Sequence, residues 1–303
     1  MPSWGEILKE IGSSQRKDAL DYVRRKYIKK LHEKRGRNVI CYYSGWLQKP
    51  RIGGVEIDDN DKNTFMATIH GLDRTKGLDL IIHTPGGQVA ATESLVHYLR
   101  TMFATDINIF IPQIAMSAGT MIACAGLVIY MGKHSNIGPI DPQFNGIPAY
   151  GVIEEFNLAI KEIKEDPAKI PIWQTIISKY HPTFLGECRN AIAWSKEIVT
   201  EWLSTGMFLT SSNPKNVAEE VVKKLSDRAM MKTHSRHIST EQAKEIGLKI
   251  ENLEQDSELQ DLVLTIHHCF VHTFNQSNAI KITENHNGIA YVSSAIVGVG
   301  GKA

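Results

Sequence analysis

The stretches LIIHTPGG (residues 80–87) and INIFIPQIAMSAGTMIACAGLVIYMG (residues 107–132) decide the fold of this 303-residue chain. The second stretch holds 26 residues without an Asp, Glu, Lys, Arg or His, which is long enough to cross a bilayer. Pro112, Ser117 and Gly119 interrupt it, however. We therefore interpret it as a buried strand (INIFI), a helix of small residues (SAGTMIACAG) and a second buried strand (LVIYMG). Such a buried strand–helix–strand unit is typical of an α/β core.

The remainder of the chain also has an α/β pattern. NVICYYSGW and LDLIIHT predict strands, and apolar residues at helical spacing predict helices over 89–102 and 152–164 and, less regularly, over 172–225. Ser239 begins a short helix that ends at Gly247, before a last strand near 248–250. The expected organisation is a basic N-terminal helical arm (1–37), a central α/β domain (38–256), and a C-terminal helix with a weakly patterned tail (257–303).

Composition and charge exclude several classes of protein. The net charge of +1, with 42% hydrophobic and 22% charged residues, is typical of a globular protein and argues against nucleic-acid binding. The four cysteines have no CxxC spacing, and the N-terminus lacks the apolar core of a signal peptide, so we expect a cytoplasmic protein. Residues 15–37 hold ten Lys or Arg against three acids. This arm is either a solvated helix face or a docking surface for an acidic partner or an anionic membrane.

The chemistry of the chain centres on a serine at the start of a helix. Ser117 lies where a buried strand turns into a helix of small residues, so free backbone N–H groups face it. Gly86-Gly87, after the preceding strand, can turn an N–H inward where a side chain would block it. A serine nucleophile needs a base and donors for the oxyanion. We predict Ser117 as the nucleophile, with the N–H groups of Gly87 and Ala118 as the oxyanion hole.

The ordered set LIIHTPGG, IPQIAMSAGTMIACAG, SNIGPIDPQ and ISTEQAKEIGLKI resembles the Clp-protease and signal-peptide-peptidase fold, within the crotonase-like superfamily. The closest resemblance is to the serine dehydrogenase proteinase family, over about 38–254. It implies an α/β fold with a Clp/crotonase-type β-superhelix core flanked by helices. It also implies a homo-oligomer and ATP-independent serine endopeptidase chemistry on polypeptide substrates, with no metal or other cofactor.

The base is where the chain departs from Clp protease, whose histidine follows the serine by about 25 residues. Here that place holds Asp141, and two histidines, His234 and His237, precede the closing helix. The Ser, Asp, His order of the serine dehydrogenase proteinase family implies Asp141 as the orienting acid and His234 as the base, with His237 as a second choice. A Ser–Lys dyad, as in signal peptide peptidases, would use Lys161 or Lys133.

Two further function classes remain open from the sequence. The chain could be a catalytically silent scaffold or accessory protein of Clp-like fold that acts through its surface. It could also be an acyl-CoA enzyme of the crotonase fold, although those enzymes seldom place a serine at the position of Ser117. The HHCFVH segment (residues 267–272) is interpreted as part of a helix with interfacial histidines, because further metal ligands are not close in sequence.

Overall fold

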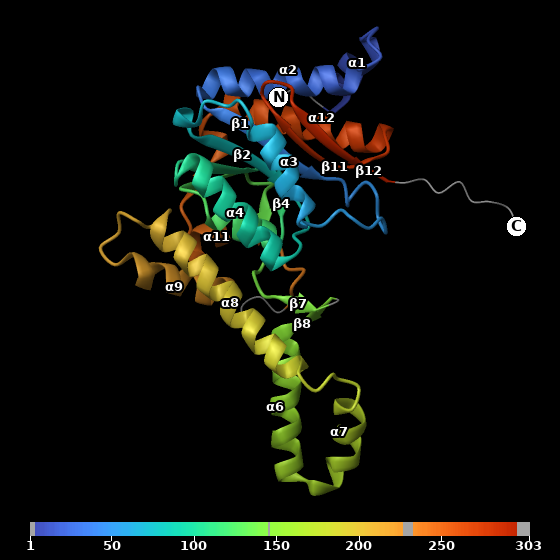
Figure 1. The fold of residues 1–303 in the computed structure, drawn as a ribbon, viewed down its shortest axis with the longest axis vertical. Coiled ribbons are helices and arrows are strands. Elements are labelled where there is room, and N and C mark those ends of the chain that lie inside the picture. Colours follow the sequence, from blue (N-terminus) through green and yellow to red (C-terminus); the bar gives the residue numbers. More distant parts are fainter. Residues whose placement is uncertain (1–3, 145, 227–232, 296–303) are drawn as a thin grey trace, which may run out of the picture.

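The computed structural model describes residues 4–144, 146–226 and 233–295 (Figure 1). Its centre is a seven-stranded mixed sheet in the order β10-β5-β3-β2-β1-β11-β12. From β10 to β1 the neighbouring strands are parallel, whereas β11 is antiparallel to β1 and β12 to β11. The strands are β1 (Asn38–Ser44), β2 (Leu78–His83), β3 (Ile107–Ile111), β5 (Val128–Met131), β10 (Ile250–Asn252), β11 (Ala279–Asn285) and β12 (Ala290–Ser294).

Helices cover both faces of this sheet, which explains why β1, β2 and β3 are buried at every residue. Alternate residues of β1 point to opposite faces: Val39, Cys41 and Tyr43 contribute to one core, and Ile40 and Tyr42 to the other. The first core is closed by α2 (Ala19–Arg35) and α12 (Ser257–Gln276). The second is closed by α3 (Asn60–Ile69), α4 (Val89–Phe103), α5 (Ala118–Cys124), α8 (Phe184–Thr205), α9 (Pro214–Leu225) and α11 (Thr240–Ile246).

A second sheet of three very short strands lies beside the first. Its order is β4-β6-β9, with β4 (Ile114–Ala115) parallel to β6 (Asn136–Ile137) and β6 antiparallel to β9 (Ile238–Ser239). A bridge between Thr84 and Ala115 joins β4 to the end of β2. The described part also contains α1 (Trp4–Ser13), the hairpin of β7 (Gln143–Phe144) and β8 (Ile147–Pro148), and 3-10 turns over 74–76, 167–169 and 253–255.

A helical arm, separate from the basic N-terminal arm, extends away from the sheets (Figure 1). It consists of α6 (Ala149–Glu165), α7 (Ile170–Ile177) and the first part of α8, and a small apolar cluster around Ala149, Val152 and Cys188 packs α6 against α8. The arm also carries large apolar side chains that are exposed: Leu158, Ile160, Ile170 and Ile172. These side chains lack the cover that the sheets receive from their helices.

The sequence predicts most of this architecture, and the α/β fold is confirmed. The charge-free stretch 107–132 forms β3, β4, α5 and β5, and among the described residues no helix is both long and apolar enough to span a membrane. The tail prediction was incomplete, because two strands follow α12 and one of them pairs with β1. The N-terminal arm consists of the two helices α1 and α2, and residues 1–3 and 296–303 lie outside the described part.

Much of the positive charge of the N-terminal arm faces the body of the protein. Arg24 is fully buried and pairs with Glu284 of β11, while Arg35 and Arg37 both pair with Asp79 of β2. Lys34 reaches Asp256 and Glu258 at the start of α12. Docking α2 onto the sheet therefore accounts for several of the basic residues. The exposed Lys29 and Lys30 lie on the outer side of α2, where the sequence leaves open a solvated face or a docking surface for an acidic partner or membrane.

We predict that Glu284→Ala lowers the free energy of unfolding by about 3–5 kcal/mol, because it removes the buried carboxylate from the Arg24 guanidinium and leaves only the half-exposed Asp21. Glu284 also pairs with Arg25, so both contacts between α2 and β11 are lost. The matched control is Glu33→Ala, which removes the exposed 3.9 Å pair with Lys29 and should change stability by less than about 1 kcal/mol. Urea unfolding measures the free energy of unfolding of both variants. Equally small losses of stability in the two would contradict the prediction.

Candidate active site

Ser117 is held in an unusual backbone conformation between β4 and α5. Its φ of 50° and ψ of −114° place it in a left-handed region that costs a non-glycine residue about 1–3 kcal/mol. The turn is closed by the Gly119 N–H, which donates to the Met116 carbonyl at 2.7 Å, and by the Met121 N–H, which donates to the Ser117 carbonyl at 3.0 Å. A sharp, strained strand-to-helix turn of this kind is what presents the nucleophile of many hydrolases.

The three-stranded sheet brings separate loops to the same edge. Ala115, Ile137 and Ile238 lie side by side in the register of β4, β6 and β9. Because β4 and β6 are parallel, the residues that follow them leave at one edge, and because β9 is antiparallel, the residues that precede it reach that same edge. Ser117 follows β4, Asp141 follows β6, and the loop with His234 and His237 precedes β9. Loops more than 100 positions apart in the sequence thus emerge at the same edge of this sheet.

His234 and Asp141 meet at this edge. The His234 Nδ1 lies 2.8 Å from the Asp141 Oδ1, and both side chains are partly buried. A carboxylate on Nδ1 keeps the proton of a neutral imidazole there, which leaves Nε2 as the acceptor. Among the hydrogen bonds of the described residues, none involves the Ser117 hydroxyl. The structure therefore brings together the predicted acid and base, with the serine on a neighbouring loop.

Two glycines after β2 pack directly against the serine turn and the chain near Ile57. Gly86 has a φ of +100°, and a Cβ there would lie 2.8 Å from the Cβ of Ser117. A Cβ on Gly87 would lie 2.3 Å from the backbone N and O of Ile57. Ile57 bonds to the Gly86 carbonyl and the Gln88 N–H, so the N–H of Gly87 points away from Ile57. In the described backbone network, the N–H groups of Gly87 and Ala118 donate to no protein acceptor.

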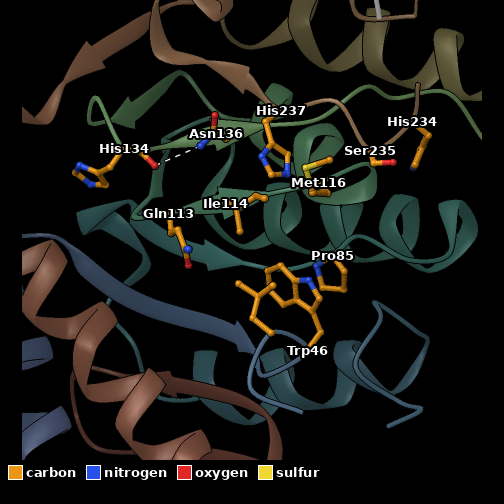
Figure 2. Close-up of a pocket in the computed structure, with 11 residues that line it drawn as sticks. Trp46, Pro85, Gln113, Ile114, Met116, His134, Asn136, His234, Ser235 and His237 are labelled. Atoms are coloured by element: carbon orange, nitrogen blue, oxygen red, sulfur yellow. Dashed lines mark hydrogen bonds between the residues drawn. The ribbon is translucent and has the colours of Figure 1, made fainter. Parts of the chain in front are cut away.

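A pocket of about 480 Å³ opens beside these loops (Figure 2). Its lining includes the apolar residues Trp46, Pro85 and Ile114 and the two histidines His234 and His237. Met116, which directly precedes Ser117, also lies on the pocket wall. A hollow with apolar walls and a few polar groups is the usual form of a ligand site, and Ser117 itself is not among the residues that line this one.

The alternative bases lie in different environments. His237 is exposed and lines the same pocket, but in the described network it has no carboxylate partner. Lys161 lies on α6 with 72% of its side chain exposed, and its neighbour is Glu165 at 4.0 Å. Lysine acts as a base when burial lowers its pKa, and this position offers no such burial.

Several residues that shape the site were not singled out from the sequence. The Thr84 carbonyl accepts from the Met116 N–H at 3.0 Å, and Thr120 Oγ1 links the Ala115 carbonyl to the Gly138 N–H. His83 is fully buried at the end of β2, with its Nδ1 3.2 Å from the Ile114 carbonyl oxygen. Burial lowers the pKa of His83 to about 3. Their polarity within apolar segments was the available signal, but sequence does not show which backbone groups they reach.

The fold and this site define the class of protein. The family model of the ClpP-like SDH-type serine proteinases matches residues 11–268, which is most of the chain. The chain belongs to this family.

The chain is also similar to two uncharacterized proteins of Methanocaldococcus jannaschii. One is 29% identical over 237 residues, which cover 77% of this chain and 74% of the relative. The other is 27% identical over 228 residues, which cover 74% and 70% respectively. A solved structure, a mutant of the 1510-N membrane-bound stomatin-specific protease, matches with 17% identity over 68% of this chain and 79% of its own, at a TM-score of 0.38. That likeness is too distant to carry an argument about the site.

We predict that Gly86→Ala destabilises the protein by about 1–3 kcal/mol, because an L side chain at a φ of +100° is strained and its Cβ meets the Ser117 turn. Gly53→Ala is the matched control, since a Cβ there has nothing within 4 Å and its φ is not in the positive region. Thermal unfolding of both variants measures the difference. A Gly86→Ala protein as stable as Gly53→Ala would show that the two loops do not pack as described.

Proposed function

We propose that this protein is a serine endopeptidase that cleaves polypeptides through an acyl-enzyme on Ser117. The single observation that carries the proposal is the 2.8 Å contact between His234 and Asp141, at the sheet edge where the strained Ser117 turn ends. Membership of a serine proteinase family supports it. The roles follow the logic of a Ser–His–Asp triad, reached here in the chain order Ser, Asp, His.

In the proposed reaction, Nε2 of His234 takes the proton of the Ser117 hydroxyl as Oγ bonds to the carbonyl carbon of the substrate. The N–H groups of Gly87 and Ala118 receive the negative oxygen that forms. The C–N bond then breaks, and His234 gives its proton to the leaving amine. A water attacks the resulting ester, its proton passes to His234, and Oγ leaves with that proton as the acid product departs. Asp141 holds the imidazole in one tautomer throughout.

His234 is preferred over the alternatives on its contacts. It has an orienting carboxylate, whereas none faces His237 in the described part, and Lys161 is exposed on the helical arm. The absence of a bond to the Ser117 hydroxyl in the described network is the observation that favours a catalytically silent scaffold. Catalytic hydrogen bonds are often long without substrate and tighten when it binds, so this geometry is also compatible with an active enzyme.

The proposal predicts a specific pattern of hydrolysis of an unfolded casein-type substrate. Ser117→Ala and His234→Ala should each lose at least about 1000-fold in rate, and the double variant should lose little more, because the residues act as a unit. Asp141→Asn should cost about 10³–10⁴-fold, since the amide favours the wrong imidazole tautomer. Lys161→Ala is the control and should keep the wild-type rate.

Other outcomes would assign the chemistry differently. A fatal Lys161→Ala with a mild His234→Ala would indicate a Ser–Lys dyad, and a fatal His237→Ala with a mild His234→Ala would move the base to His237. Equal rates for wild type and Ser117→Ala would end the peptidase proposal.

We also propose that the enzyme works as a homo-oligomer, with the helical arm as one contact between copies. The arm exposes Leu158, Ile160 and Ile172 far from the two main cores. Large apolar side chains exposed on one extended arm are candidates for a protein–protein contact.

Light scattering during size exclusion should give a mass that is a multiple of 33.9 kDa at micromolar concentration. Ile172→Asp should lower this mass, because it places a carboxylate in the apolar surface of the arm. Met66→Asp, at an exposed apolar residue on α3, is the control and should leave the mass unchanged. A strictly monomeric wild-type protein would contradict the proposal.

A further inference from the structure

His83 links the two segments that lead to the candidate site, the end of β2 and the strand β4. It ends β2 and directly precedes the loop that holds Gly86 and Gly87. Its Nδ1 lies 3.2 Å from the Ile114 carbonyl oxygen of β4, the strand that leads to Ser117. A carbonyl oxygen can only accept, so His83 carries its proton on Nδ1 and donates it to Ile114.

The other nitrogen of this ring, Nε2, finds no protein partner among the described residues. Nε2 is buried without a hydrogen bond in the described part of the chain, and so are the Tyr43 hydroxyl and the His267 Nδ1 nearby. The His83 ring centre lies 4.4 Å from that of Trp46 and 5.1 Å from that of His267. No group of three His, Cys, Asp or Glu side chains within the described ranges has the arrangement of a metal site. A metal ligand is therefore not the role that this ring suggests.

A half-satisfied buried imidazole is a poor choice for a core that needs only stability. An unpartnered buried polar atom costs about 1–3 kcal/mol, whereas an apolar side chain of similar size would have no such cost. Burial also lowers the pKa of His83 to about 3, so the ring stays neutral at neutral pH. Unlike an apolar side chain, the imidazole can donate a hydrogen bond from its Nδ1–H on β2 to the Ile114 carbonyl of β4.

We propose that His83 is a positioning residue, whose Nδ1–H sets the position of the Ser117 turn relative to the oxyanion loop. The inference rests on the function proposed above. The Ile114 carbonyl also accepts the Thr84 N–H at 3.3 Å, and the Thr84 carbonyl accepts the Met116 N–H at 3.0 Å. These bonds form a short ladder between the two loops, and His83 is the side chain that reinforces it.

The consequence for catalysis is geometric. Gly86 touches the Ser117 turn, so a shift of β4 against β2 moves the nucleophile relative to the Gly87 N–H. A displacement of about 1 Å in a catalytic group can cost about 100-fold in rate. Loss of the His83 bond should therefore lower kcat while substrate binding in the pocket is largely kept.

Three variants of His83 separate its two nitrogens. Asparagine places an amide N–H near the position of Nδ1, glutamine places one near Nε2, and leucine removes both. We expect His83→Asn to keep kcat within about 5-fold of wild type, and His83→Gln and His83→Leu to lose about 100-fold in kcat with KM changed less than about 3-fold. Melting temperatures close to wild type would show that the loss is not unfolding. If the leucine variant does not fold, the comparison of asparagine with glutamine decides.

Hydrogen–deuterium exchange tests the hydrogen bond between His83 and Ile114 without an activity measurement. In His83→Gln and His83→Leu, peptides that contain Thr84 and Met116 should exchange at least about 10-fold faster than in wild type, whereas His83→Asn should match wild type. If the wild-type protein has no hydrolytic activity but exchange follows this order, the proposed function is wrong, whereas the positioning role of the His83–Ile114 hydrogen bond is confirmed. Equal exchange and equal kcat in all three variants would overturn the inference, as would equal losses in all three.

Discussion

The position of the candidate site depends on three strands of only two residues each. β4, β6 and β9 form few hydrogen bonds of their own, yet their register places Ala115, Ile137 and Ile238 in one row, which the bridge to Thr84 extends to the main sheet. The direction of each strand then decides where its neighbouring loop emerges. Ser117, Asp141 and His234 emerge at one edge because these directions agree, and the Gly86–Gly87 loop, which follows β2, packs against the Ser117 turn. Sheets this small are stable only when larger elements hold them, and here the seven-stranded sheet and its helices do so.

The strain at the site is local and is balanced by packing around it. Ser117, at a φ of 50°, is the strained residue, and Gly86 packs so close to it that a Cβ on Gly86 would lie 2.8 Å from the Ser117 Cβ. The surrounding bonds are made by buried polar groups of Thr84, Thr120 and His83 within otherwise apolar segments. Strained conformations persist in proteins when their surroundings determine them in this way, and such strain is common at functional sites.

Much of the fold could be predicted from the sequence, because long apolar runs and glycine positions report burial and turns directly. The strands around Ile81 and Ile109, the serine turn and the capping box at Ser239 belong to this group. The strand over 279–285 was missed: its Lys281, Glu284 and Asn285 are buried polar residues whose partners come from distant elements. The order Ser, Asp, His came from a resemblance, and the meeting of Asp141 with His234 across 93 positions is beyond any local pattern. The role of His83 depends on one carbonyl that sequence cannot locate.

The central claim is that Ser117 is an activated nucleophile at this sheet edge. The most direct measurement is the reaction of the full-length protein with a fluorophosphonate probe, followed by mass spectrometry of the modified peptide. The account predicts one adduct per chain on Ser117, none in Ser117→Ala, and strongly slowed labelling in His234→Ala. Labelling that is absent in the wild type, or that persists at the same rate in Ser117→Ala, would contradict it.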